Sequence, residues 1–498
     1  MMRHQYQFLF FLILISFFLN SCYHNKKQKN VLMIIIDDLR PEIGAWGNKH
    51  IITPSLDKLS EKGVSFHNAF SQYANCSPSR ISLLTGLSPE TLGHTGNLRS
   101  KPKFSKHITL PRHFKNNGYF TASIGKIYHD AKDDSESWDY FYDLVGPDKP
   151  WTDPSNRWEC YADSINNQLY GHDRPAIEKS NKSLNSYKDF VLCEKAMEIL
   201  GKQKDNKFFV ALGFRKPHLP FAAPYKYWEL YDRNNISQSE HPMFPINADT
   251  TVYKWSELSA YNYFKQNYET SNYQNRIIDQ DKSRQLRHGY YACVSFIDNL
   301  VGKIMHKLEE LDLSQNTIVV VIGDHGFQLG DQQIWGKHSN FRLSTRVPLI
   351  IYDPSFDSKS QKSDEFVELL DIFPTLSEIA SLPKPINFDG KSFANIFHGA
   401  NGNEYKFAYS QYQSFQKNTN FSTLMSYAIH EKNHTYIEWQ DVKENFKVVN
   451  RELYEFDDDK IEKVNISGYP QYADIIMEFS KNINLYFKRH RLKAETFK

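Results

Sequence analysis

The sequence predicts an α/β fold, in which a large, mostly parallel sheet carries helices on both faces and a small antiparallel sheet follows near the C-terminus. Continuous apolar runs are typical of fully buried strands, and they occur at residues 31–36, 208–212, 317–322 and 347–352. Residues 290–311 repeat apolar side chains at spacings of three and four, which predicts an amphipathic helix. Strands that alternate with helices indicate a sheet covered on both sides.

The pattern of apolar and polar residues changes after about residue 400. Short segments that favour strands are separated there by polar turns, at residues 407–412, 424–429, 434–439 and 452–456. These segments predict the small antiparallel sheet. In contrast, residues 130–205 and 232–285 are polar, aromatic and weakly periodic, so we expect long surface excursions in both regions.

Composition excludes several classes of protein. The chain has 498 residues with 60 Lys or Arg and 58 Asp or Glu, which leaves a formal net charge of +2. Because that balance excludes a surface that is basic all over, we expect no nucleic-acid partner. Hydrophobic residues make up 40% and aromatic residues 15%, which excludes intrinsic disorder. Five cysteines argue against a disulfide scaffold, although a pairing of Cys160 with Cys193 stays open.

The N-terminus predicts an export signal. Residues 8–19 are apolar and uncharged, too short for a membrane span of about 20 residues but suited to the core of a secretory signal. The Leu-Asn-Ser-Cys segment that ends at Cys22 resembles the lipobox of bacterial lipoproteins. This resemblance implies removal of residues 1–21, lipid attachment at Cys22 and a polar tether over residues 22–30. The protein would then be periplasmic or at the cell surface, held to a membrane by lipid alone. The alternative is an ordinary signal peptide with an incidental Cys22.

Acidic and imidazole side chains follow two of the predicted strands. Asp37 and Asp38 come directly after one strand, and Asp324 and His325 follow another. Ligands of α/β sheets collect at the carboxyl ends of the strands, although paired aspartates also serve simply as helix caps. Carboxylate oxygens suit a hard cation such as Ca²⁺, while the imidazole of His325 also suits Mn²⁺ or Zn²⁺.

Residues 76–86 read CSPSRISLLTG and predict a helix. Pro78 suits the first turn of a helix and Gly86 suits its end. Cys76 therefore lies beside a helix N-terminus, where backbone N–H groups favour anions. Arg80 adds a positive charge one turn later. The simpler alternative is a buried thiol near the start of a helix.

This Cys-Ser-Pro-Ser-Arg segment, followed by Leu-Thr-Gly, resembles the signature of the type I, formylglycine-dependent sulfatases. The resemblance implies that Cys76 is oxidised to 3-oxoalanine (formylglycine) by a separate formylglycine-generating or anaerobic sulfatase-maturating enzyme. It implies an alkaline-phosphatase-like catalytic domain over residues 31–400 and a C-terminal subdomain over residues 401–498. It also implies Ca²⁺ held by Asp37, Asp38, Cys76, Asp324 and His325.

Further segments resemble the iduronate-2-sulfatase branch of that family. Lys126 and His129 lie in GKIYH, His218 in RKPHLPF, and Lys337 in WGKHSNF. The resemblance implies that Lys126 and Lys337 contact the sulfate. It implies that His129 accepts a proton from the hydrated aldehyde and that His218 protonates the leaving oxygen. The implied catalytic residues are Cys76, Arg80, Lys126, His129, His218 and Lys337.

The chemistry of sulfate esters explains why these residue types occur together. Hydrolysis needs positive charge on the nonbridging oxygens, a nucleophile aimed at sulfur and a proton for the leaving oxygen. A hydrated formylglycine is a gem-diol: one hydroxyl attacks sulfur, and deprotonation of the other expels sulfate and restores the aldehyde. A plain serine or cysteine has no second hydroxyl for that step.

The sequence therefore predicts a sulfuric ester hydrolase that acts on a sulfated sugar or polysaccharide. The branch it resembles acts on 2-sulfated uronates of heparan or dermatan type. Three alternatives stay open: a sulfatase for another polysaccharide such as an algal one, a phosphonate or phosphate ester hydrolase of the same superfamily, and an inactive glycan-binding surface lipoprotein. Loss of Cys76, Arg80 or a metal-binding aspartate would mark the last class, and none of these residues is lost.

Overall fold

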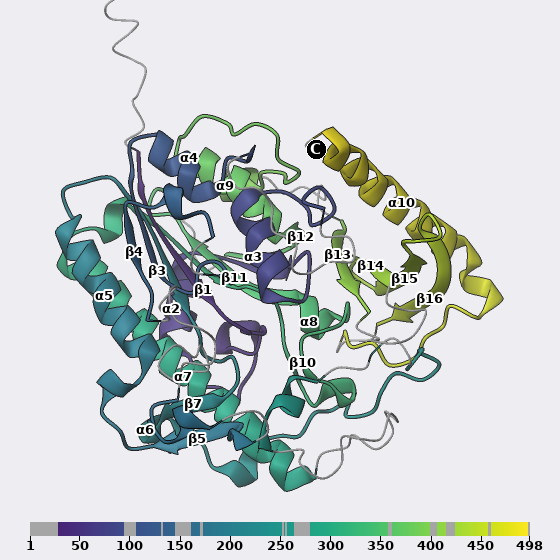
Figure 1. Ribbon diagram of the computed structural model, residues 1–498, viewed down its shortest axis with the longest axis horizontal. Helices are drawn as coiled ribbons and strands as arrows, with labels where there is room; N and C mark the ends of the chain where they lie inside the picture. Colours follow the sequence, from purple (N-terminus) through teal and green to yellow (C-terminus); the bar gives the residue numbers. More distant parts are fainter. Residues whose placement is uncertain are drawn as a thin grey trace, which may run out of the picture.

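An eight-stranded mixed sheet forms the centre of the fold, in the strand order β12-β2-β11-β8-β1-β6-β3-β4 (Figure 1). The computed structural model describes residues 28–93, 106–130, 133–144, 161–169, 173–250, 253, 256–262, 279–356, 361–398, 406–414, 424–456 and 460–496. The strands of the sheet are β1 (Asn30–Ile36), β2 (Val64–Phe70), β3 (Phe120–Gly125), β4 (Tyr140–Tyr142), β6 (Phe208–Phe214), β8 (Thr317–Gly323), β11 (Arg346–Tyr352) and β12 (Gln361–Glu368). Only β11 runs antiparallel to its neighbours among these described strands. The four apolar runs are confirmed as β1, β6, β8 and β11.

Helices cover both faces of this sheet, as predicted. Alternate side chains of β1 point to opposite faces: Leu32 and Ile34 join one apolar core, whereas Val31 and Met33 join the other. The first core is closed by α2 (Pro54–Lys62), α5 (Lys188–Lys202) and α7 (Gln280–Glu310). The second is closed by α3 (Cys76–Thr85), α4 (Leu110–Asn116) and α9 (Ile372–Ile379).

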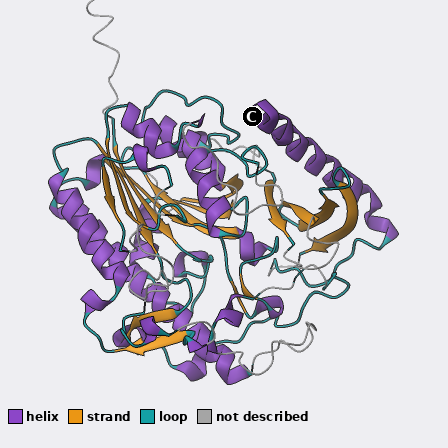
Figure 2. Cartoon of the chain, viewed as in Figure 1, coloured by secondary structure: helices purple, strands orange, loops and turns teal. Residues whose placement is uncertain are grey.

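A separate four-stranded antiparallel sheet follows near the C-terminus, which confirms that part of the prediction (Figure 2). Its strands are β13 (Ala408–Gln413), β14 (Leu424–His430), β15 (His434–Asp441) and β16 (Lys447–Glu455). The helix α10 (Ala473–Thr496) lies along this sheet and buries Phe479, Ile483 and Phe487 in its core (Figure 1). The sequence analysis did not predict α10.

Smaller strands and helices connect these elements, together with short 3-10 helices such as Glu257–Ala260. The smaller strands and helices are β5 (Ile177–Ser180) paired with β7 (Phe221–Pro224), β9 (Gln328–Leu329) paired with β10 (Trp335–Gly336), and the short helices α6 (Tyr225–Trp228) and α8 (Arg342–Thr345). The expectation of surface excursions over residues 130–205 was too simple, because α5 lies there and packs Leu192 and Ala196 into the core. Its apolar positions anchor it to the sheet between stretches of polar chain.

Two of the remaining cysteines are free thiols. Cys193 and Cys293 are fully buried in the same apolar core, and neither forms a disulfide in the described chain. Cys160 and the predicted lipid-attachment residue Cys22 lie outside the described residues, as does the predicted signal segment. Within the described part of the chain, no helix is both long and apolar enough to cross a membrane.

Candidate active site

Two neighbouring strands of the large sheet bring their acidic ends together. β1 and β8 are parallel partners, so Asp37 and Asp38 lie beside Asp324 and His325. The backbone N–H of Asp38 donates to Oδ1 of Asp324 at 3.1 Å. Asp38 has φ of +60°, a left-handed conformation that costs energy for a residue with a Cβ. From this turn the Asp38 carboxylate faces Nζ of Lys337 at 2.8 Å and Nε2 of His325 at 3.5 Å.

The helix α3 presents Cys76 to this acidic edge. The Asn75 side chain caps the helix by accepting from the backbone N–H of Ser77. Gly86 ends the helix at φ of +65°, as predicted. The Cys76 side chain is buried, and its Sγ lies 3.4 Å from Oδ1 of Asp37 and 3.2 Å from Nε2 of His325. The candidate nucleophile position therefore meets the predicted metal ligands directly.

Arg80, one turn after Cys76, ties the cluster together. Its guanidinium is fully buried and contacts Oδ1 of Asp37 at 3.0 Å and Oδ2 of Asp324 at 2.8 Å. It also donates to the backbone carbonyls of Lys126 and Ile127. One side chain thus joins the ends of β1, β8 and β3. Arg80 orients the acidic groups, because all its described contacts are with protein carboxylates and carbonyls.

Two lysines contact the Cys76 sulfur. Nζ of Lys126 lies 3.5 Å from Sγ, and Nζ of Lys337 lies 3.4 Å from it. Lys126 also pairs with Oδ2 of Asp37 at 2.5 Å, and Lys337 pairs with Oδ1 of Asp38 at 2.8 Å. Lys126 follows β3 at Gly125, whose φ is +74° and where a Cβ would meet the carbonyl of Gly213.

Two buried histidines turn their Nε2 atoms toward the same centre. Nδ1 of His325 donates a hydrogen bond to the Gly326 carbonyl at 2.9 Å, and Nδ1 of His218 donates to the Leu219 carbonyl at 2.7 Å. Nε2 of His325 then lies 3.5 Å from Asp38 Oδ1, and Nε2 of His218 lies 3.8 Å from Asp38 Oδ2. Burial lowers the pKa of His325 to about 4 and that of His218 well below its usual range. Both imidazoles are therefore neutral at pH 7.

His129 differs from the other predicted site residues because it is exposed. Loss of hydration beside the cluster, together with the positive charges of Lys126 and Arg80, lowers its pKa to about 3. Among the described residues, no direct hydrogen bond joins it to the other members. It lies at the rim of the cluster, exposed to solvent but close enough to feel the charges of Lys126 and Arg80.

The carboxylates fit a bound cation. Atoms of Asp37, Cys76, Asp324 and His325 all lie within 4.8 Å of one another, and atoms of Asp37, Asp38, Cys76 and His218 form a second such group. Oδ2 of Asp38 is buried without a hydrogen-bond partner in the described chain. Burial and the neighbouring carboxylates of Glu257 and Asp37 raise the pKa of Asp38 well above its usual range, although Lys337 opposes this. A divalent cation would give Oδ2 of Asp38 a partner and would offset the repulsion between Asp38 and the neighbouring carboxylates.

The charges around Asp37 lower its pKa, whereas those around Asp38 raise the pKa of that residue. Burial disfavours its ionised form, but Lys126 and Arg80 outweigh that effect and hold the pKa of Asp37 well below its usual range. Burial and the Asp37 charge raise the pKa of the Cys76 thiol well above its ordinary value. The unmodified thiol is therefore protonated at neutral pH and is a poor nucleophile in this form.

One buried acid of the site was missed in the sequence analysis. Glu257 contacts Nζ of Lys337 at 3.0 Å and Nε2 of His338 at 3.3 Å. It lies in the weakly periodic stretch 232–285, where no strand end or motif marks it. No local sequence signal identifies Glu257, because only the folding of that stretch over residues 335–338 brings it into the site.

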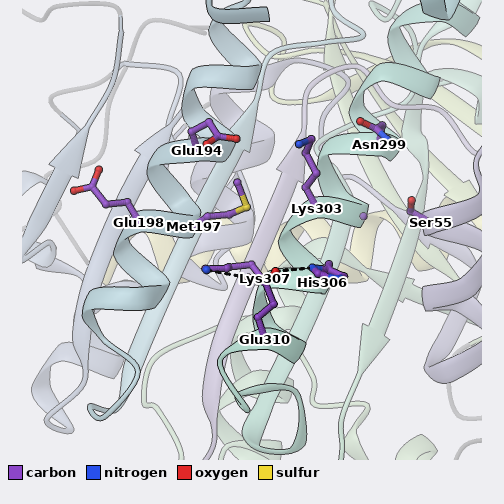
Figure 3. A pocket seen from close by; sticks show the side chains of 10 residues that line it. Ser55, Glu194, Met197, Glu198, Asn299, Lys303, His306, Lys307 and Glu310 are labelled. Carbon is purple, nitrogen blue, oxygen red and sulfur yellow. Dashed lines mark hydrogen bonds and ion pairs between the residues drawn. The ribbon is translucent and has the colours of Figure 1, made fainter.

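The cluster is distinct from a surface groove on the same molecule. That groove, of about 790 Å³, lies between α5 and α7 and is lined by charged side chains such as Glu194, Lys303 and Glu310 (Figure 3). It shares no residue with the strand-end cluster. The chemistry-bearing side chains therefore gather at the carboxyl edge of the sheet, in agreement with the general rule for such sheets.

The fold and the cluster together define an alkaline-phosphatase-like hydrolase. The family model "Sulfatase" matches residues 29–382, and the model "N-sulphoglucosamine sulphohydrolase, C-terminal" matches residues 330–489. The chain belongs to the sulfatase family. Iduronate 2-sulfatase of Mus musculus is 30% identical to it over 516 residues, which cover 90% of this chain and 92% of that protein.

Solved structures share the fold at lower sequence identity. A phosphonate monoester hydrolase from Silicibacter pomeroyi superposes with a TM-score of 0.73 at 20% identity, covering 93% of this chain and 96% of that one. A protein in complex with its substrate D-glucosamine-2-N,6-O-disulfate also gives a TM-score of 0.73 at 20% identity, covering 93% and 99%. These likenesses support the fold assignment and leave the substrate of this chain to be argued from its site.

Proposed function

We propose that this sulfatase hydrolyses sulfate monoesters of a sulfated sugar, with formylglycine at position 76 and a bound Ca²⁺. The observation that carries the proposal is the placement of Cys76 Sγ within 3.5 Å of Lys126, Lys337, Asp37 and His325. These groups are the cations, metal ligands and imidazole that a sulfate ester requires around its nucleophile.

Two groups that are not encoded amino acids, formylglycine and Ca²⁺, would complete the site. Formylglycine would supply a hydroxyl nucleophile with a second hydroxyl for sulfate release, and Ca²⁺ would supply further positive charge for the sulfate oxygens. Asp37, Asp38, Asp324 and His325 would hold the metal together with residue 76. Oxygen ligands predominate in this set, which favours Ca²⁺ over softer metals.

The chain's own residues would perform the remaining tasks. Lys126 and Lys337 both place Nζ within 3.5 Å of the atom Sγ at position 76, so their ammonium groups can neutralise nonbridging oxygens of one sulfate. Nε2 of His218 is held toward the same centre because Nδ1 donates to the Leu219 carbonyl, so Nε2 of the neutral ring carries no proton. The negative charge of a bound sulfate ester would favour protonation at Nε2, and His218 would then give that proton to the leaving oxygen. His129 at the rim would accept the proton released when sulfate departs.

A 2-sulfated uronate is the substrate class that we propose first. The support is the 30% identity to iduronate 2-sulfatase over nine-tenths of the chain. The fold is shared with a phosphonate monoester hydrolase, so a phosphonate monoester is the second candidate. A sulfated polysaccharide of another type, such as an algal one, would use the same cluster.

The first experiment tests the nucleophile. Wild-type protein and the C76A variant are assayed for sulfate release, and peptides containing residue 76 are weighed by mass spectrometry. We expect C76A to lose activity by at least about 10³-fold. We also expect the wild-type peptide to be lighter by the difference between a thiol and an aldehyde side chain. The peptide containing Cys193 serves as control and keeps its thiol mass. Active protein with an unmodified thiol at position 76 would contradict the proposal.

The second experiment tests the substrate. Defined sulfated mono- and oligosaccharides, an aryl phosphonate monoester and an aryl phosphate are compared by kcat/KM on the same preparation. We expect a 2-sulfated uronate at a non-reducing end to give the highest value. Preference for the phosphonate would instead assign the chain to the second candidate class.

We also propose that the protein is an exported lipoprotein, attached through Cys22. The supporting observation is the apolar run followed by a small residue and cysteine. Growth of the native host or a bacterial expression host with labelled palmitate should label the wild-type protein and leave a C22A variant unlabelled. Label retained in C22A would overturn this assignment.

A further inference from the structure

Glu257 is a buried acid in the site that the proposed reaction does not yet use. It opens the short 3-10 helix Glu257–Ala260 and is about nine-tenths buried. Its Oε1 contacts Lys337 at 3.0 Å and His338 at 3.3 Å. Its Oε2 is buried and has no hydrogen-bond partner in the described chain. A carboxylate left half-satisfied in a polar site is costly, so its negative charge calls for an explanation.

The backbone around Glu257 is fixed to the loop that carries Lys337. Ser256 Oγ donates to the Trp335 carbonyl at 3.0 Å. Gly336, between Trp335 and Lys337, lies against this segment, because a Cβ there would be in van der Waals contact with the Glu257 backbone nitrogen at 3.4 Å. The two segments therefore form one packed unit. Glu257 is a fixed counter-ion for Lys337, because its position is determined from both the backbone and the side chain.

Glu257 also completes a charge balance. Contacts of 3.5 Å or less connect one network of charged side chains through Cys76. Its four carboxylates and three cations are Asp37, Asp38, Asp324, Glu257, Arg80, Lys126 and Lys337. Counted as formal charges, these side chains give four negative charges against three positive ones, and a divalent cation would bring the positive total to five.

We propose that Glu257 is a positioning residue that holds Lys337 and matches the site to a monoanion. A sulfate monoester carries one negative charge, whereas a phosphate monoester carries close to two at neutral pH. With Glu257 ionised, the metal-bound site and a sulfate ester neutralise each other. Without that charge, the site would carry one more positive charge and would favour the dianion. This inference rests on the proposed function, because it assumes a divalent cation among the same carboxylates.

Glu257 has a second effect through the position of Lys337. Lys337 Nζ lies 2.8 Å from Oδ1 of Asp38, so a cation held by Asp38 would compete with Lys337 for that carboxylate. Glu257 is then the carboxylate that keeps Nζ beside position 76. Charge matching and orientation thus depend on the same contact.

The test measures binding rather than turnover. Calcium-loaded C76A protein is titrated calorimetrically with 4-nitrophenyl sulfate and with 4-nitrophenyl phosphate, which differ mainly in charge. We expect tighter binding of the sulfate. The C76A protein is then given a second substitution, E257Q, which keeps the size of the side chain and removes its charge. This substitution should change the ratio of the two dissociation constants by about tenfold or more in favour of phosphate binding. E257D keeps the charge and should restore most of the ratio, even if both affinities fall.

The control variant is E178Q. Glu178 is also a buried acid, but it accepts hydrogen bonds from the backbone of Ala162 and Asp163, away from the cluster. Its substitution should leave the ratio unchanged. An unchanged ratio in E257Q, or the same shift in E257D as in E257Q, would overturn the inference. If E257Q does not fold, preference of the C76A parent for the phosphate would overturn it as well.

Failure of the proposed function has a different signature. It would appear as wild-type protein, with Cys76 in place, that releases no sulfate from any ester tested. A wild-type protein that hydrolyses sulfate esters while E257Q leaves the binding ratio unchanged would keep the proposed function and discard only the role of Glu257.

Discussion

Arg80 and Asp324 form a fully buried ion pair, with 2.8 Å between Nε and Oδ2. The same guanidinium reaches Asp37 at 3.0 Å, so a residue of α3 joins the ends of two sheet strands. Such a planar fork suits two carboxylates at once, which an ammonium group cannot reproduce. Arg80 is therefore both a structural link and the group that orients two predicted metal ligands.

The variant R80K should lose stability and activity together. Lysine keeps the charge but cannot contact both carboxylates, which leaves one buried charge poorly compensated. We expect the free energy of unfolding, measured in urea, to fall by about 3 kcal/mol, and kcat/KM for sulfate release to fall by at least about 100-fold. R112K is the control, because Arg112 forms a partly exposed pair with Asp134 and should change the stability by less than about 1 kcal/mol. Wild-type stability in R80K would contradict the role of this ion pair.

Asp38 should couple the stability of the protein to Ca²⁺. Without metal, its charge is repelled by neighbouring carboxylates, so D38N should be at least as stable as the wild type in EDTA. With Ca²⁺ at 100 times its Kd, the wild type should gain about 2.7 kcal/mol and D38N much less. Thermal melting of both proteins in EDTA and in Ca²⁺ measures both differences in stability. The control is D205N, because Asp205 lies at an exposed turn. EDTA should also abolish sulfate release, and Ca²⁺ should restore it better than Zn²⁺. Equal stabilisation of D38N by Ca²⁺ would remove Asp38 from the ligand set.

The central strands could be predicted from the sequence because both of their faces are buried. β1 and β8 are apolar at almost every position, since each strand supplies both cores. β2 and β12 lack that signal. The buried polar residues Ser65 and Asn68 interrupt β2, and Asn68 is satisfied by a hydrogen bond to the Asp364 carbonyl of β12. Such compensation depends on the neighbouring strand and is invisible in a local pattern.

The site residues were predictable wherever a motif follows a strand or opens a helix. The structure brings Asp37, Asp38, Cys76, Asp324 and His325 together, although their catalytic and metal-binding roles stay predictions. Glu257 could not be found in this way, because a contact between distant segments places it. α10 is a different case. Its buried Phe479, Ile483 and Phe487 recur at a spacing of four, so the helical signal was present and was overlooked among polar neighbours.

α10 provides a matched pair of stability variants. Ile483 is fully buried against the small sheet, whereas Leu485, two residues later, is 62% exposed. I483A removes buried apolar volume and should lower the free energy of unfolding by about 2 to 5 kcal/mol. L485A should change it by less than about 0.5 kcal/mol. Urea unfolding of both variants checks the comparison, and equal effects would show that α10 does not pack as described.

Glu90 should make the stability depend on pH between about 4.5 and 7. The carboxyl group is fully buried, accepts from the Tyr427 hydroxyl at 2.5 Å and lies 3.8 Å from Arg491 of α10. Burial raises its pKa from 4.5 to about 7, although Arg491 partly opposes the change. The folded state therefore binds this proton more tightly than the unfolded state. The resulting stabilisation is complete below the unfolded pKa and is lost as the pH rises through the folded value.

The variant E90Q isolates this contribution. Other buried carboxyl groups titrate in both proteins, so the quantity to measure is the difference in unfolding free energy between wild type and E90Q. From pH 5 to pH 8 the wild type should lose about 2.5 kcal/mol relative to E90Q. The exposed Glu61 supplies the control variant E61Q, whose difference from wild type should stay constant across this range. A constant difference for E90Q would mean that Glu90 is already ionised in the folded protein at pH 5, with Arg491 outweighing its burial.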